Sequence, residues 1–218
     1  MMYKSSALML GAIVVAPAAF ANPDTPQLHP VEAVCVDYEQ SGQMQSGTST
    51  RCHRDYGYEQ YEISNVTIGM AGFSQSQSTF TVTIGDTIYA INTDNNTATQ
   101  TVNPMYQGIA DAVAQSGSDS VSDAVLNAMG MSPTGQSRTV IGLSCNVYSS
   151  SMMGTACLTE DGLMLEQSVM GTQVTATAVT YDEGVAENYR RHESATITQG
   201  PDLSNGLSGV TDFLGQGN

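Results

Sequence analysis

The sequence contains no tryptophan, only four phenylalanines and few positive charges. Lys and Arg together number 6 against 21 Asp and Glu, so the formal net charge is −15. A charge of this sign and size repels nucleic acids and anionic lipid surfaces, and it keeps a protein in solution. We therefore predict no nucleic-acid partner and no polybasic membrane role. The scarcity of aromatic residues means that the core is built mainly from Val, Ile, Leu, Met, Ala and Tyr.

Long apolar runs are also missing. No stretch approaches the roughly 20 apolar residues that a transmembrane helix needs, so we predict no transmembrane segment. The apolar stretch 7–15 follows Lys4 and precedes an A-x-A site that ends at Ala21. This order is typical of a secretory signal peptide, 1–21, and no cysteine lies at the cleavage point to carry a lipid anchor. We predict cleavage after Ala21 and a periplasmic or secreted mature chain of net charge 5 − 21 = −16, because Lys4 is removed.

Catalytic and metal-binding motifs are the third absence. G-x-S-x-G, Walker A and H-E-x-x-H do not occur in the sequence. His53 and Asp55 share one face of a predicted strand, but two ligands suit a solvated strand edge better than a metal site. The stretch 92–96 (NTDNN) lacks the Gly and the distal Glu of an EF-hand loop, and a hairpin turn explains it. We predict a protein that is not an enzyme, with no catalytic residues, no metal and no cofactor.

What the sequence does contain is an even set of cysteines in a chain predicted to be exported, and this favours disulfides. Strands predicted at 33–40 and 48–54 fold about residues 43–44, which places Cys35 opposite Cys52. A strand at 139–148 that returns as 155–159 about Ser151 places Cys145 opposite Cys157. Opposed residues of an antiparallel pair lie close enough for a disulfide. We predict these two bonds, since a four-cysteine zinc site would need short C-x2–4-C spacings.

Alternating residues predict strands along most of the chain. Phe80, Val82 and Ile84 alternate with threonines, which is typical of a half-buried strand. Turns at 85–86 and 94–96 join this strand to two more, at 87–93 and 97–102. After a helical insert, strands resume at Thr139 and form a second meander that ends near Tyr181, with one further strand near 195–198. The sequence predicts a mainly β (α+β) fold with an antiparallel sheet.

Between residues 105 and 131 the apolar period changes from 2 toward 3.6. A short helix is predicted at 106–115, and a second helix follows it with one apolar face (Val121, Ala124, Val125, Ala128, Met129). Because that face needs a packing partner, the insert is predicted to cover the open face of the sheet. On the functional interpretation, Val121, Val125, Met129 and Met131 lie on a lid above an apolar cavity. On the alternative interpretation, the methionines fill a core that is short of aromatic residues.

Three stretches carry a family resemblance: SGQMQSGTSTRCHRDYGYEQYE, IGDTIYAINTDNNTATQTVNPM and IGLSCNVYSSSMMGTACLTEDGLML. They resemble an uncharacterised family of exported bacterial proteins that is related to the LolA/LolB-type lipoprotein carriers. The resemblance covers residues 31–180. It implies a strongly curved antiparallel half-barrel with a helical lid across its concave side, where the carriers hold acyl chains.

The predicted organisation is a signal peptide (1–21), a half-barrel β domain (22–182) with a helical insert (105–131), and a loosely structured C-terminal segment (183–218). Two functions remain open at this stage. The first is an exported non-catalytic protein that binds a lipid or another apolar small molecule beneath the lid. The alternative is an envelope structural or protein-interaction module that has an envelope protein as its partner and no small-molecule ligand.

Overall fold

The computed structural model describes residues 25–43, 45–70, 73–103, 106–116, 126, 130–151, 154–169 and 171–200. The predicted signal peptide lies outside the described residues, as do Val121, Val125 and Met129 of the predicted lid. No helix in the described part of the chain is long and apolar enough to cross a membrane.

The protein is mainly β, as the alternating residues predict. Its strands are β1 (Val34–Gly42), β2 (Gln45–Arg54), β3 (Glu59–Met70), β4 (Phe73–Ile84), β5 (Thr87–Asn92), β6 (Thr97–Val102), β7 (Ser132–Val140), β8 (Leu143–Ser150), β9 (Gly154–Leu158), β10 (Met164–Val169), β11 (Thr172–Thr180) and β12 (Thr196–Gln199). The short helical elements are η1 (Asp55–Gly57), α1 (Tyr106–Ser116), α3 (Ala186–Tyr189) and η3 (Arg191–Ser194).

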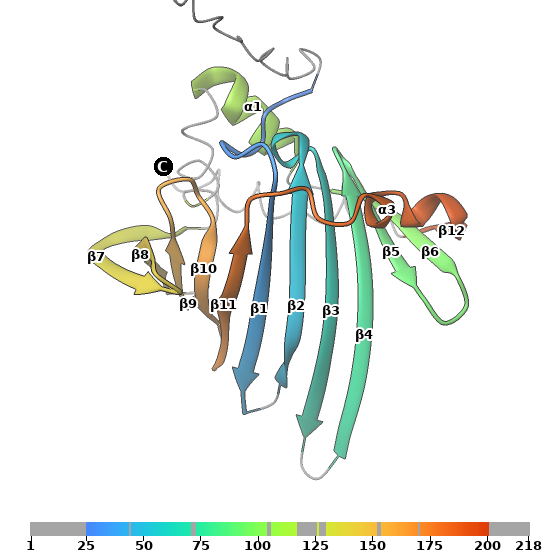
Figure 1. Cartoon of the computed structure of the whole chain (residues 1–218), viewed down its shortest axis with the longest axis horizontal. Coiled ribbons are helices and arrows are strands. Elements are labelled where there is room, and N and C mark those ends of the chain that lie inside the picture. Colours follow the sequence, from blue (N-terminus) through green and yellow to red (C-terminus); the bar gives the residue numbers. More distant parts are fainter. Residues whose placement is uncertain are drawn as a thin grey trace, which may run out of the picture.

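All the strands belong to one 12-stranded sheet in the order β12-β6-β5-β4-β3-β2-β1-β11-β10-β9-β8-β7. The strands β1–β6 and β7–β11 are the two predicted meanders, and β1 joins them by pairing antiparallel with β11. The order ends at β12 and β7, so the sheet is open rather than closed on itself. Figure 1 shows the long strands β1–β4 at the centre, with shorter strands on both sides.

Both predicted disulfides are present: Cys35–Cys52 and Cys145–Cys157. The first hairpin has the predicted register, with Cys35 opposite Cys52. The predicted register of the second hairpin is wrong, because Cys157 pairs with Val147 and its disulfide joins it to a diagonal neighbour. The reason lies at Gly154, which has a positive φ of 74° and packs so tightly on β10 that a Cβ would collide with the Ser168 carbonyl oxygen. The return strand β9 begins at Gly154. Its register differs from the predicted one by two residues, so each side chain still lies on the predicted face.

The prediction of a single strand at 139–148 is also wrong, because a tight turn separates β7 from β8 within this stretch. Ile141 and Gly142 occupy the turn with φ values of 46° and 84°. Positive φ at both central residues is typical of type I′ hairpins, and it is unusual for a β-branched residue. Ile141 lies in an apolar run, so its side chain favours a strand although its backbone forms the turn. Strand β7 ends at this turn, and it starts at Ser132, before the predicted Thr139.

The helical predictions have mixed outcomes. Helix α1 confirms the short helix predicted at 106–115, whereas the second predicted helix falls mostly outside the described residues, with only Leu126 described as helical. The start of the segment expected to be loosely structured, 183–218, is regular. Residues 186–199 form α3, η3 and β12, and β12 pairs parallel with β6. Residues 201–218 lie outside the described residues.

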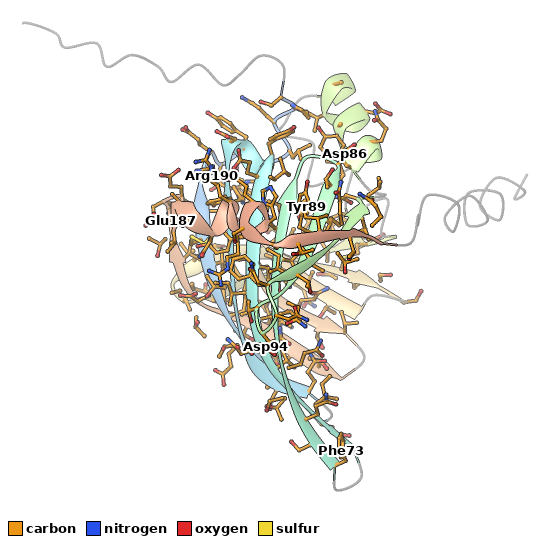
Figure 2. All side chains as sticks on the ribbon, turned by 90° about the vertical axis from the view of Figure 1, so that its right-hand side faces the viewer. Phe73, Asp86, Tyr89, Asp94, Glu187 and Arg190 are labelled. Carbon is orange, nitrogen blue, oxygen red and sulfur yellow. A yellow bond between two sulfur atoms is a disulfide. The ribbon has the colours of Figure 1, made fainter. Side chains whose placement is uncertain are left out.

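Helix α3 crosses one face of β3 and β4 near one end of the strands (Figures 1 and 2). The core cluster on this face consists of Cys52, Tyr61, Phe80, Val82, Ile91, Ala98 and Tyr189. Tyr189 is 1% exposed, and its ring meets that of Tyr61 edge-on at a centroid distance of 4.9 Å. The burial of Phe80 and Val82 confirms the alternation predicted for β4. A second core cluster, around Leu163 and Leu165, joins β1 to the second meander.

Candidate functional site

The face of the central strands that points away from α3 has a different character. Because side chains alternate along a strand, the neighbours of buried Cys52, Tyr61 and Val82 point the other way. Pairing places Arg51 opposite Glu62, and Glu62 opposite Thr81, so these residues form one row across β2, β3 and β4. The next row contains His53, Gln60 and Thr83. The same strands therefore present an apolar face to α3 and a polar face on the other side.

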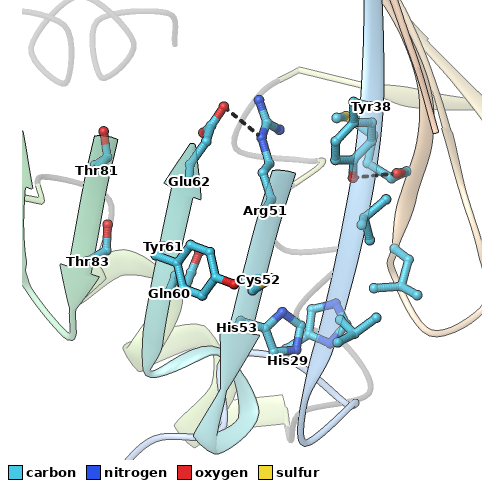
Figure 3. Close-up of a pocket in the computed structure, with 14 residues that line it drawn as sticks. His29, Tyr38, Arg51, Cys52, His53, Gln60, Tyr61, Glu62, Thr81 and Thr83 are labelled. Atoms are coloured by element: carbon cyan, nitrogen blue, oxygen red, sulfur yellow. Dashed lines mark hydrogen bonds and ion pairs between the residues drawn. The ribbon is translucent and has the colours of Figure 1, made fainter. Parts of the chain in front are cut away.

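A cavity of about 210 Å³ lies against this polar face; we call it the β1–β4 pocket (Figure 3). Its polar lining consists of His29, Tyr38, Arg51, His53, Gln60, Glu62, Thr81 and Thr83. Its apolar lining comes from β1 and the second meander: Val34, Val36, Leu163 and Met164. Cys52 and Tyr61 complete the wall. The pocket is thus polar on the β2–β4 side and apolar on the side of β1 and β10.

Arg51 and Glu62 form an ion pair in this pocket. The Nε atom of Arg51 lies 3.2 Å from Oε1 of Glu62, although its N–H is not aligned for a hydrogen bond (Figure 3). The guanidinium carbon also lies 5.3 Å from the centroid of the Tyr38 ring, within the range of a cation–π contact. The two side chains are 42% and 35% exposed, so the pair is open to a ligand that enters the pocket.

Tyr38 is a buried neutral donor beside this ion pair. Its hydroxyl donates a hydrogen bond to the Met164 carbonyl oxygen at 2.8 Å (Figure 3). Burial raises the pKa of Tyr38 to about 12, and the nearby Arg51 charge lowers it by less. The phenol therefore stays protonated at neutral pH and fixes β1 to the start of β10.

Two histidines close one end of the pocket. The rings of His29 and His53 lie 4.4 Å apart, centroid to centroid (Figure 3). The Val31 N–H donates to Nδ1 of His29 at 3.1 Å, and Nε2 of His53 lies 3.0 Å from the Val31 carbonyl oxygen. Burial lowers the pKa of His29 to about 4, with the charge of His53 as a second cause, and burial also lowers the pKa of His53. Both rings are therefore neutral at pH 7 and hold the segment before β1 against β2.

The two residues considered as metal ligands do not lie on one strand, because β2 ends at Arg54. His53 contacts His29 and Val31, whereas Asp55 begins η1 with a positive φ of 50°. Within the described residues there is no group of three or more His, Cys, Asp or Glu side chains that could hold a metal ion. Asn92, Asp94 and Asn95 occupy the β5–β6 turn, as predicted: the Asn92 side chain accepts a hydrogen bond from the Asp94 N–H. The Asn95 side chain accepts one from the Thr97 N–H.

The one predicted lid residue that the structure describes is Met131, and it does not line the pocket. Met131 is 5% exposed and packs with Leu126 and Ala156, next to Tyr148 and Leu158. Its side chain thus fills a small core over β8 and β9, in agreement with the alternative interpretation of the methionines. Val121, Val125 and Met129 lie outside the described residues.

The sequence contains a signal for the pocket that the predictions missed. Arg51 and His53 alternate with Cys52, and Gln60 and Glu62 alternate with Tyr61. Once Cys52 is placed in the core, these polar neighbours must share the opposite face of adjacent strands. His29 had no such signal, because it lies before the first strand and reaches the pocket only through tertiary packing.

No family model and no curated protein matches this chain. Among solved structures, the chain is similar to an uncharacterised conserved protein from Thermus thermophilus. The two share 8% sequence identity with a TM-score of 0.47, and the alignment covers 78% of this chain and 92% of the other. This similarity assigns no activity.

Proposed function

We propose that the protein is an exported, non-catalytic binding protein whose ligand site is the β1–β4 pocket. The observation that carries the proposal is the pocket itself: an ion pair and hydroxyl groups on one wall face aliphatic side chains on the other. Pockets that bind small molecules combine an apolar lining with a few polar groups that fix orientation. The ligand class that fits is a small molecule with a short apolar part and a polar head.

Size favours a small ligand over a lipid. The cavity measures about 210 Å³, below the roughly 300–1,000 Å³ of pockets that enclose drug-sized molecules. The apolar wall is also short, since it consists of Val34, Val36, Leu163 and Met164. Within the predicted class of apolar ligands, we therefore favour a molecule with a few carbon atoms over a complete acyl chain.

Charge balance favours a neutral or zwitterionic polar head. Arg51 is already balanced by Glu62, and both histidines have a lowered pKa. An anionic ligand would add negative charge to a chain of net charge −15. A zwitterion or an amide can instead place an acceptor at Arg51 and a donor at Glu62.

The half-barrel shape and the helical lid form a second part of the proposal. We propose that α1 and the chain through Leu126 and Met131 border the side of the sheet where the pocket lies. Two observations support this: α1 lies beyond the ends of the central strands, apart from α3 (Figures 1 and 2), and Leu126 and Met131 pack on β8 and β9. The resemblance to the LolA/LolB-type carriers stays a prediction.

Export is supported by the two disulfides, since such bonds persist in oxidising compartments. We propose a periplasmic or secreted location after removal of residues 1–21.

Binding can be tested with three probes: leucine (zwitterionic), hexanamide (neutral) and hexadecanoate (a long acyl chain). We expect leucine or hexanamide to raise the unfolding temperature of the oxidised protein and hexadecanoate to leave it unchanged. Arg51→Gln should weaken probe binding by about tenfold, equivalent to about 1.4 kcal/mol. The matched control is Arg138→Gln, because Arg138 pairs with Glu166 away from the pocket. Tight binding of hexadecanoate alone, or equal effects of the two variants, would reject the small-ligand site.

The alternative function, an envelope structural or protein-interaction module, is favoured by a separate observation. Half of strand β4 has an uncovered edge, since residues 73–79 pair with β3 only. An uncovered edge is a common site of strand addition in protein recognition. If none of the probes binds and native mass spectrometry of the purified protein finds no bound small molecule, this alternative takes precedence over ligand binding.

A further inference from the structure

Several strand edges are uncovered in the described part of the sheet, and the two outermost strands, β7 and β12, are protected. The outer strand β7 contains Pro133, Gly135 and Arg138, and its register is irregular between Pro133 and Ser137. The outer strand β12 is only four residues long. Proline, charge, irregular register and short length are the features by which natural proteins prevent other strands from pairing with an edge.

The uncovered edge of β4 has none of these features. Residues Phe80–Ile84 pair with β5, whereas Phe73–Thr79 pair with β3 only. The pairing with β3 runs without a bulge from Met70↔Phe73 to Glu59↔Ile84. All residues from Phe73 to Thr79 are exposed, and no proline or charged residue occurs between Glu62 and Asp86. In a chain of net charge −15, this edge is uncharged along its whole length.

The register shows which backbone groups this edge offers. The Cα atoms of Cys35 and Cys52 lie 4.1 Å apart, the spacing of a non-hydrogen-bonded pair. Hydrogen-bonded and non-hydrogen-bonded pairs alternate from one strand to the next across a sheet. Cys52 and Tyr61 are therefore a hydrogen-bonded pair, and Tyr61 and Val82 are again a non-hydrogen-bonded pair. Val82 thus directs its N–H and C=O toward β5. By the same alternation, Ser74, Ser76 and Ser78 direct their backbone groups to the open edge.

The serine side chains strengthen the hairpin instead of blocking its edge. The Ser78 hydroxyl donates to the Asn65 side chain at 2.7 Å, and the hydroxyls of Ser76 and Thr67 lie 3.1 Å apart. Both contacts reach across to β3. They keep the strand extended and leave the backbone of the edge free to pair.

We propose that this edge binds a second copy of the same chain, with the two β4 strands antiparallel about a two-fold axis. In this arrangement Ser76 lies opposite the partner's Ser76, and Ser74 opposite the partner's Ser78, and each pair exchanges both backbone hydrogen bonds. Gln75 then lies opposite the partner's Gln77, so the side-chain amides form a pair across the interface. A two-fold interface uses the same surface on both copies, which this sequence allows.

Charge favours this edge over charged surfaces as the place where two copies pair. Two copies with net charge −15 repel each other, and the two-fold arrangement joins them at the neutral stretch between Glu62 and Asp86. Asp94, at the turn of the β5–β6 hairpin, borders the groove beside this edge (Figure 2). A basic partner would be attracted to the acidic surface elsewhere, and the neutral edge gives it no electrostatic advantage.

Exposed apolar side chains at the same end of the hairpin support pairing. Phe73 is 67% exposed at the tip of the β3–β4 hairpin (Figure 2), and Ile68 is 43% exposed. In the proposed register Phe73 lies opposite the partner's Thr79 and loses contact with water. The proposed dimer interface does not include the lining of the β1–β4 pocket. The test of the dimer is therefore independent of the test of ligand binding.

Sedimentation of the oxidised protein tests the dimer, up to a concentration of about 1 mM. We expect a reversible dimer. Ser76→Pro removes one N–H on the open edge and leaves the β3 ladder intact, and Ser76→Lys places two positive charges opposite each other. Each variant should weaken the dimer by at least about tenfold. The control Ser132→Lys makes the same change on the exposed, protected edge of β7 and should leave the dimer unaffected.

Amide hydrogen exchange gives a second, site-specific measurement. The amides of Ser74, Ser76 and Ser78 should exchange more slowly as the protein concentration rises, whereas those of Gln75 and Gln77 are already bonded to β3 and should not change. Three results would overturn the proposal: a monomer at every concentration, a dimer that survives both Ser76 variants, or protection of the serine amides that does not depend on concentration. The last result would mean that another part of the same chain covers the edge.

Discussion

The two faces of the central strands are built from alternate residues of the same segments, yet they have opposite properties. On the α3 side, Tyr61 is 4% exposed and Val82 is fully buried. On the pocket side, the neighbouring Glu62 and the paired Arg51 have side chains 35% and 42% exposed. The comparison indicates that the face under α3 stabilises the sheet, whereas the side chains of the pocket face are accessible to solvent. Substitutions on the two faces should therefore affect different measurements.

The largest expected effect is on the covered face. Tyr189 fills the space between α3 and the sheet, where it contacts the Tyr61 ring and the Arg54 guanidinium. Tyr189→Ala should lower the free energy of unfolding by about 4 kcal/mol, because it leaves a cavity in the core. Urea unfolding measures this loss. The control Tyr181→Ala removes a ring that is 58% exposed and should change stability by less than about 0.5 kcal/mol.

The next effect compares the two disulfides. Each closes a short loop, with sequence separations of 17 and 12, so replacing either pair by serine should cost about 3 kcal/mol. Cys35–Cys52 lies directly beneath Gly184, where a Cβ would come within 2.5 Å of the Cys35 sulfur. Its loss should therefore also loosen the α3 side and cost more than the loss of Cys145–Cys157. Urea unfolding midpoints of the two variants, measured under oxidising conditions, test this order. An unchanged midpoint without Cys145–Cys157 would contradict a stabilising role for that bond.

The third effect concerns acid and the pocket face. His29 has a pKa of about 4 in the folded protein, below the ordinary 6.5, because burial disfavours its charged form. The folded state therefore binds fewer protons than the unfolded state between these values. The stabilisation is complete above about pH 6.5 and is lost as the pH falls toward 4, by about 2–3 kcal/mol.

This acid effect is measured as the difference in urea unfolding between the parent protein and His29→Gln, since carboxyl groups titrate in both. The variant should lose stability less steeply over the same pH range. Equal slopes for the two proteins would show that His29 is not held neutral by its surroundings.

The smallest expected effect on stability is at Arg51. Its ion pair with Glu62 is partly exposed, and such pairs contribute less than about 1 kcal/mol. Arg51→Gln should therefore leave the urea midpoint almost unchanged while it weakens probe binding. A loss of stability as large as that of Tyr189→Ala would remove the distinction between the two faces.

Local pattern predicted the strands well where one face is buried. The alternation of Phe80 and Val82 with threonines predicted β4, and the Cys35–Cys52 hairpin followed from two strands and a turn. The same reasoning failed at Ile141, where an apolar side chain occupies a left-handed turn, and at Gly154, where close backbone packing sets the register. In both cases the backbone conformation overrides the preference of the side chains.

The candidate site was less predictable than the strands. Pairs such as Arg51 and Glu62 belong to neighbouring strands, so their register could be read once the β2–β3 pairing was known. The residues that complete the pocket lie outside this pairing: His29 precedes β1, and Leu163 comes from the distant segment before β10. Leu163 reaches the pocket because β1 pairs with β11, a contact between the two meanders that no local pattern indicates.

The amino-acid sequence alone determined the strand-rich fold, the two disulfides and the acidic character of the protein, because each depends on residue type and short-range spacing. Tertiary structure decided the rest: the joining of the two meanders in one sheet, the placement of α3 over one face, and the resulting polar pocket on the other. Those features depend on contacts between segments far apart in the chain, whose free energies no local pattern contains.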